Sequence, residues 1–227
     1  MDADVRRSMD TGTRTETFWG SHPITNPDLG PLLTQLTELL NRGRELAAEQ
    51  RANFVERAAA SARKRELERT IRAVHVAHLS QAGALAARDD HSIGTSFRLA
   101  PTSGSFAAFR NAVGTMAEAA ERHRDALIKH RMSPTVLADL GEALKEFDLA
   151  VERGNKARAG HVEASAQLRL VGADILRVVK LMDAIARLEF KADPALLAGW
   201  KSVSRRQAVA RDTADEPAPT GDVRPAA

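Results

Sequence analysis

The nine prolines of this chain leave two long stretches without any proline. No proline falls between Pro31 and Pro101, or between Pro134 and Pro194. Because proline breaks the interior of a helix, these are the stretches in which long helices can form. Ala, Leu, Arg, Glu and Lys together make up much of the chain, and they are strong helix formers. Since no alternating strand pattern of useful length occurs, the sequence predicts an all-α fold.

Capping signals divide this all-α chain into four predicted helices. Ser133–Pro134 and Asp193–Pro194 each place a capping side chain before a proline at the first helical position. Ser105 offers a further N-cap, and the Asp89–Gly94 segment reads as the end of the first long helix. We expect an elongated antiparallel helical bundle with two long helices, one medium and one short helix, covering approximately residues 31–88, 105–131, 134–190 and 194–207.

The two ends of the chain look different from this helical middle. Residues 1–26 and 208–227 are predicted to be disordered tails, and residues 27–207 form the predicted helical bundle. The first residues hold no apolar run of about 7–15 residues, so we expect no secretory signal. No apolar stretch reaches about 18 residues, so no membrane-spanning helix is expected. The expected location is the cytoplasm.

Apolar residues of the second and third predicted helices recur in alternating steps of three and four. This spacing keeps one stripe facing a partner helix, as in coiled coils and helical bundles. In the second helix the predicted stripe is Phe106, Phe109, Val113, Met116, Ala120, His123, Leu127 and His130. In the third helix it is Leu137, Leu140, Leu144, Phe147, Val151, Gly154, Arg158, His161, Ser165, Leu168, Gly172, Ile175, Val179 and Met182.

Glycines and small residues raise two questions about the long helices. We expect the first helix to continue through Gly43, whereas a break of the third helix between Gly154 and Gly160 and an unbroken helix both remain open. The middle of each long segment is rich in small residues, at 58–62 and 159–166. Such stretches indicate either a tight helix crossing or dimer contact, or a surface filled with good helix formers.

Few residue patterns in the chain carry chemistry. There is no cysteine, so disulfides, thiolate metal sites and a cysteine nucleophile are excluded. The sequence contains no nucleophile elbow and no glycine-rich phosphate loop. We therefore expect a protein that is not an enzyme, with no cofactor and no assigned catalytic, cofactor-binding or metal-binding residues.

Histidine is the most obvious metal-ligating residue type here, with seven copies. A di-iron carboxylate bundle needs a Glu-x-x-His motif on each of two helices, and this chain has none. A metal-binding helical bundle remains an alternative, against the simpler interpretation of histidines bonded to neighbouring side chains. The roles left open are those of His75, His78, His123, His130 and His161.

A cluster of basic residues motivates a second alternative, a nucleic-acid-associated protein. Its members share a few turns of the first helix and are Arg63, Lys64, Arg65, Arg69 and Arg72. Such a face could contact phosphates. Glu66 and Glu68 are interleaved with it, however, and the net charge of the chain is only +3. A solvated face crossed by ion pairs is the competing interpretation.

The leading expectation is therefore a non-enzymatic helical scaffold or protein-interaction protein that self-associates through its long helices. It would act as a homo-oligomer, with an additional protein partner that the sequence does not identify.

Overall fold

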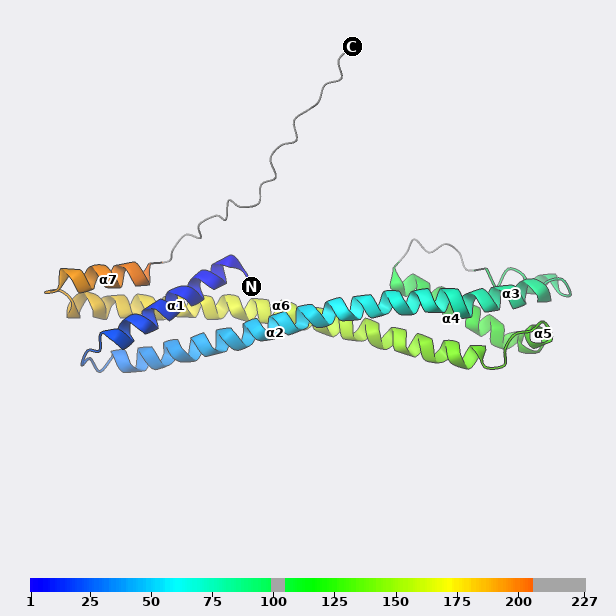
Figure 1. Cartoon of the computed structure of the whole chain (residues 1–227), viewed down its shortest axis with the longest axis horizontal. Helices are drawn as coiled ribbons and strands as arrows, with labels where there is room; N and C mark the ends of the chain where they lie inside the picture. Colours follow the sequence, from blue (N-terminus) through cyan, green and yellow to red (C-terminus); the bar gives the residue numbers. More distant parts are fainter. Residues whose placement is uncertain (99–104, 206–227) are drawn as a thin grey trace, which may run out of the picture. The chain divides into compact units, whose positions relative to one another are not determined.

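The computed structural model describes residues 1–98 and 105–205, and within these ranges every regular element is a helix. The all-α prediction is confirmed (Figure 1). The elements are α1 (Ala3–Ser21), α2 (Leu29–Thr70), the π-helix η1 (Ile71–Val76), α3 (Ala77–Ala86), the 3-10 turn η2 (His91–Ile93), α4 (Phe106–Arg122), α5 (Arg124–Lys129), α6 (Val136–Glu189) and α7 (Pro194–Ser204).

Both long helices run through the glycines that could have ended them. α2 is unbroken at Gly43, as predicted, and α6 is unbroken from Val136 to Glu189. A Cβ atom on Gly43 would lie 2.5 Å from the sulfur of Met9, and one on Gly160 would lie 2.7 Å from Nδ2 of Asn53. These two glycines therefore mark places where another helix approaches closely, not helix ends.

The predicted helix boundaries hold at some positions and fail at others. The hydroxyl of Ser105 caps α4 by accepting a hydrogen bond from the Ala108 N–H. The Asp193 carboxylate caps α7, accepting from two backbone N–H groups at 3.0 Å. The predicted helix 105–131 is instead divided at His123 into α4 and α5. The predicted helix 134–190 begins two residues late, at Val136.

The prediction of a disordered tail over residues 1–26 is wrong, because α1 occupies most of it. Asp2 caps α1 at its N-terminus. The inner face of α1 packs into the core. The sequence hid the helix because most of that buried face is small or hydroxylated and gives no apolar period. The buried residues of α1 are Val5, Ser8, Thr11, Gly12, Thr15, Phe18 and Trp19.

The described chain divides into two compact units where one bundle was predicted. Unit 1 comprises residues 1–48 and the described part of 164–227, and unit 2 comprises residues 49–163. Each unit has its own hydrophobic core, and α2 and α6 contribute residues to both units. The predicted disordered tail 208–227 lies outside the described residues.

Unit 1 is closed by an aromatic cluster on α1, α7 and the end of α6. The ring of Trp19 stacks on Phe190, with centroids 5.5 Å apart, and lies 5.2 Å from that of Trp200. The Trp200 indole Nε1 donates a hydrogen bond of 2.8 Å to the Asp183 carboxylate. This cluster holds α1 and α7 against each other (Figure 1).

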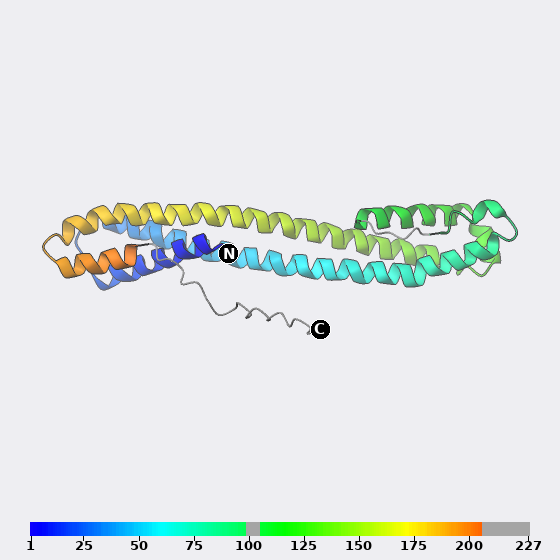
Figure 2. The same cartoon turned by 90° about the horizontal axis from the view of Figure 1, so that it is seen from above.

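Unit 2 places α4 alongside α6, as Figure 2 shows. Phe106 and Phe109 from α4 both contact the ring of Phe147, with centroids 6.0 and 5.7 Å apart. Leu140 is fully buried in the same core. Aromatic pairs of this kind add to the free energy gained by burying the rings.

The predicted stripes are largely confirmed, with one shift in the middle of α6. Most apolar members are buried, and Leu140, Ile175 and Met182 are fully so. Arg158, which was assigned to the stripe, is exposed, and Ala157 is buried in its place. Ala164 is likewise more buried than Ser165. The seven-residue period therefore holds, but at these two positions the buried residue is an alanine one place earlier in the sequence.

Candidate interaction surface

The basic cluster of the first long helix is largely engaged within unit 2. Arg63 forms ion pairs with Glu66 on the same helix and with Glu146 on α6, at 3.0 and 2.5 Å. Hydrogen bonds to these two carboxylates, that of Glu66 first, raise the pKa of Arg63. The Arg63 guanidinium therefore links α2 to α6.

Two more members of the basic cluster lie over aromatic rings of α4. Lys64 Nζ is 4.6 Å from the centroid of Phe106, and the Arg72 guanidinium carbon is 4.6 Å from that of Phe109. Arg72 also pairs with Glu68 at 2.9 Å. Cations placed in this way are held by the ring faces, so Lys64 helps fix α4 on α2 and Arg72 helps fix α4 on η1.

The other two members, Arg65 and Arg69, are exposed, and Nε of Arg69 lies 3.4 Å from the backbone oxygen of Arg65. The structure therefore does not assemble the five residues into one open cationic face.

Six of the seven histidines are dispersed over unit 2, His22 lies in unit 1, and several of them contact backbone or carboxylate groups. His78 Nε2 accepts a hydrogen bond from the Ser133 N–H at 3.0 Å. His161 Nδ1 lies 3.2 Å from the Gln50 carbonyl oxygen, and His130 Nε2 lies 3.1 Å from Asp89 Oδ2. Among residues 1–98 and 105–205, no three His, Asp or Glu side chains are grouped so that they could hold a metal ion.

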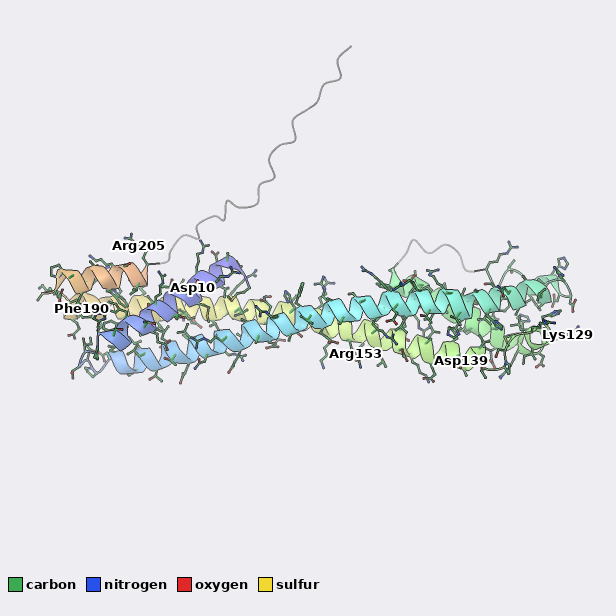
Figure 3. All side chains as sticks on the ribbon, viewed as in Figure 1. Asp10, Lys129, Asp139, Arg153, Phe190 and Arg205 are labelled. Carbon is green, nitrogen blue, oxygen red and sulfur yellow. The ribbon has the colours of Figure 1, made fainter. Side chains whose placement is uncertain are left out.

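α2 and α6 of unit 2 enclose a groove of about 410 Å³, which we call the inter-helix groove. Its charged members are two carboxylates and two guanidinium groups, so its side chains carry no net charge. Figure 3 labels one of them, Arg153, on α6. The groove is lined by Glu56, Ala59, Ala60, Arg63, Glu146, Leu149, Ala150 and Arg153.

Next to this groove the two helices meet through small residues. A Cβ atom on Gly154 would lie 3.5 Å from Cβ of Ala60, which is van der Waals contact. Ala60, Ala150 and Ala157 are all buried, with exposed fractions of 5%, 5% and 4%. Within the alanine-rich segment 58–62, Ala60 therefore lies in the contact between the two helices, whereas Ala58, Ala59 and Ala62 are exposed, as expected for a surface of good helix formers.

This part of unit 2 leaves large apolar side chains in solvent. We call residues 49–62 and 150–163 the two-helix stretch. Around it, Phe54, Val55, Leu149 and Val162 are 61%, 60%, 53% and 62% exposed. α4 does not extend over this stretch in either view (Figures 1 and 2). Its first residue, Phe106, contacts Lys64, which lies just beyond residue 62. No other described helix of unit 2 covers it.

The sequence analysis did not predict this surface, because periodic apolar stripes indicate only the faces that pack inward. Phe54 and Val162 are large apolar residues outside the predicted stripes and close to a run of alanines, and this pattern could have indicated the surface. Only the observed burial shows which of the apolar residues stay outside.

Within the described ranges, no helix combines the length and the apolar character needed to cross a membrane. A scan of the sequence against protein-family models found no match, and searches among curated proteins and among solved structures found none either.

Proposed function

We propose that this protein is a non-enzymatic helical interaction protein that pairs with a second copy of itself through the two-helix stretch of unit 2. The observation that carries the proposal is the exposure of Phe54, Val55, Leu149 and Val162 beside a seam of alanine and glycine.

The energetic argument rests on how little the two helices bury here. Helices in proteins gain most of their stability from packing an apolar face. Alanine and glycine offer little apolar area, so the seam at Ala60 and Gly154 contributes less than the leucine and phenylalanine contacts of either core. Covering the four exposed side chains with another copy would supply the missing burial at about 25 cal/mol per Å².

The charges of the inter-helix groove favour a second copy over a polyanion. Glu56 and Glu146 balance Arg63 and Arg153, and Arg63 is already paired. Two identical surfaces with balanced charge meet without net repulsion, and self-pairing of one patch is the commonest form of oligomer. A nucleic acid would instead need a surplus of cations, which this surface lacks.

The test is a mass measurement in solution by light scattering after size exclusion. We expect the wild type to have a mass above that of the 24.6 kDa chain. The variant Phe54→Glu/Val162→Glu should have the mass of one chain, because each change places a charge in the contact. Both side chains are more than half exposed, so the fold of one copy should survive, and circular dichroism checks this.

A matched control uses exposed leucines of unit 1. Leu170→Glu/Leu188→Glu adds the same charge to side chains that are 66% and 76% exposed, and it should leave the mass unchanged. A wild type that has the mass of one chain contradicts the proposal, as does equal dissociation of both variants.

Two other outcomes would favour the alternatives. A monomer that binds DNA through the basic cluster, Arg63, Lys64, Arg65, Arg69 and Arg72, would favour the nucleic-acid alternative. Stoichiometric metal in the purified protein would favour the metal-binding alternative.

A further inference from the structure

α6 and α7 of unit 1 form a second groove, of about 540 Å³, which we call the basic groove. It is separate from the proposed self-association surface, which belongs to unit 2. Four of its side chains are cationic and one is a carboxylate, so the side chains carry a net charge of +3. The groove is lined by Leu176, Val179, Lys180, Asp183, Arg187, Lys201, Ser204 and Arg205.

Most of the positive charge in the basic groove is not neutralised by an ion pair. Lys180, Lys201 and Arg205 are exposed, and their side chains make no hydrogen bond or ion pair with described residues. They contrast with Arg63 and Arg72 of unit 2, which have carboxylate partners. The C-terminus of α7 offsets only about half a charge, because that is the strength of a helix dipole end.

The single carboxylate of the groove is fixed in place by its neighbours. Asp183 Oδ1 accepts the hydrogen bond from Trp200 Nε1, and Oδ2 accepts from Nε of Arg187 at 2.7 Å. Burial acts to raise the pKa of Asp183, but the hydrogen bonds from Trp200 and Arg187 outweigh it and the pKa is lowered. Because the carboxylate uses only Nε of Arg187, the terminal nitrogens of that guanidinium remain for another acceptor.

The helices that carry these cations are held by the unit 1 core. Trp200 is fully buried one residue before Lys201, and its ring lies 5.6 Å from that of Phe18. At the end of α7, the backbone oxygen of Arg205 accepts a hydrogen bond of 3.2 Å from Arg14 of α1. Arg205 is labelled there in Figure 3. The cations therefore project from a positioned backbone, which lowers the entropy lost when an anion binds.

We propose that the basic groove binds a phosphate-bearing anion with more than one negative charge. Guanidinium and ammonium groups are the usual donors to phosphate oxygens, and arginine can donate two parallel hydrogen bonds. The volume of the groove falls within the range of small-molecule sites, about 300–1,000 Å³. Leu176 and Val179 add an apolar wall that can contact an organic group attached to the phosphate.

The test is calorimetric titration of the full chain with pyrophosphate at low ionic strength. We expect saturable binding that weakens as salt is added, because salt screens exposed charges. Lys201→Glu/Arg205→Glu should weaken the affinity about a hundredfold, assuming roughly a tenfold loss for each contact. The matched control, Arg6→Glu/Arg44→Glu, reverses two exposed arginines of unit 1 outside the groove and should keep the wild-type affinity.

Absence of saturable binding by the wild type overturns the proposal, and so does an equal loss of affinity in both double variants, which would indicate attraction to the overall charge.

The phosphate could belong to a free metabolite or to a lipid headgroup. Flotation with phosphatidylglycerol vesicles, compared with phosphatidylcholine vesicles, distinguishes the two sources. Binding of pyrophosphate without flotation assigns the groove to free phosphates, and selective flotation that Lys201→Glu/Arg205→Glu abolishes assigns it to lipid.

Discussion

At the scale of single residues, His75 is the least expected feature of the chain. It lies in the π-helix η1, is only 9% exposed, and its Nδ1 has no hydrogen-bond partner among the described residues. Short π-helical segments often occur at functional sites. Burial lowers the pKa of His75 from its ordinary value of 6.5, the negative charge of Asp139 acts in the opposite direction, and His78 lowers the pKa further.

This lowered pKa predicts a loss of stability in mild acid. Between the folded pKa of His75 and its ordinary value, only the unfolded chain binds the proton, so the free energy of unfolding falls as the pH drops below 6.5. The fall ends once the pH is below the folded pKa. Urea unfolding at a series of pH values from about 7 to 5 measures the effect. His75→Leu should flatten this pH dependence, and an equal slope in both proteins would contradict the assignment.

At the scale of secondary-structure elements, the docking of α1 depends on a close approach between helices. A Cβ atom on Gly12 would lie 2.8 Å from Cγ2 of Ile175 on α6 and 3.0 Å from Cδ2 of Leu40 on α2. No real side chain fits at these distances without a shift of its neighbours. By contrast, a Cβ atom on Gly20 of the same helix would meet nothing within 4 Å.

The two glycines of α1 should therefore respond in opposite directions to alanine. Overpacking costs about 1–3 kcal/mol, which exceeds the roughly 1 kcal/mol that alanine gains over glycine in a helix. Gly12→Ala should lower the free energy of unfolding by about 1 kcal/mol, whereas Gly20→Ala should raise it by about 0.5–1 kcal/mol. Thermal unfolding followed by circular dichroism compares them. A stabilising Gly12→Ala would show that α1 does not pack as described.

At the scale of the whole molecule, two hydrophobic cores share two helices. Leu140 belongs to the unit 2 core and Ile175 to the unit 1 core, and both side chains are fully buried on α6. α4 and α5 contribute residues only to unit 2, and α1 and α7 only to unit 1. Each core can therefore be disturbed separately through one long helix.

Hydrogen exchange should reveal the two units as separate cooperative regions. Truncating a buried aliphatic side chain costs about 2–5 kcal/mol, chiefly in the core that loses it. In Leu140→Ala, exchange should accelerate in α4 and α5 while α1 and α7 keep their wild-type rates. Ile175→Ala should give the reverse pattern. Mass spectrometry of peptides from these helices checks both variants, and uniform acceleration in either one would mean a single cooperative core.

The sequence by itself determined the secondary structure class and most helix positions. Two proline-free stretches can hold long helices, and their apolar residues recur with a helical rather than a strand period. These periodic leucines and phenylalanines are expected to be buried, because exposed apolar faces are costly. Caps such as Asp193 act within a few residues, so a local pattern was enough to identify them.

Only the tertiary structure decided which surfaces are closed. α1 was missed because Gly12 and Thr15 are buried by the approach of other helices, and no local pattern reports that approach. Three cations of the basic cluster, Arg63, Lys64 and Arg72, contact partners on α4 or α6, whereas Lys201 and Arg205 pair with no carboxylate of the described residues. Periodicity shows which residues of a helix share a face, but burial and pairing depend on residues far apart in the chain, and these meet only when the helices pack.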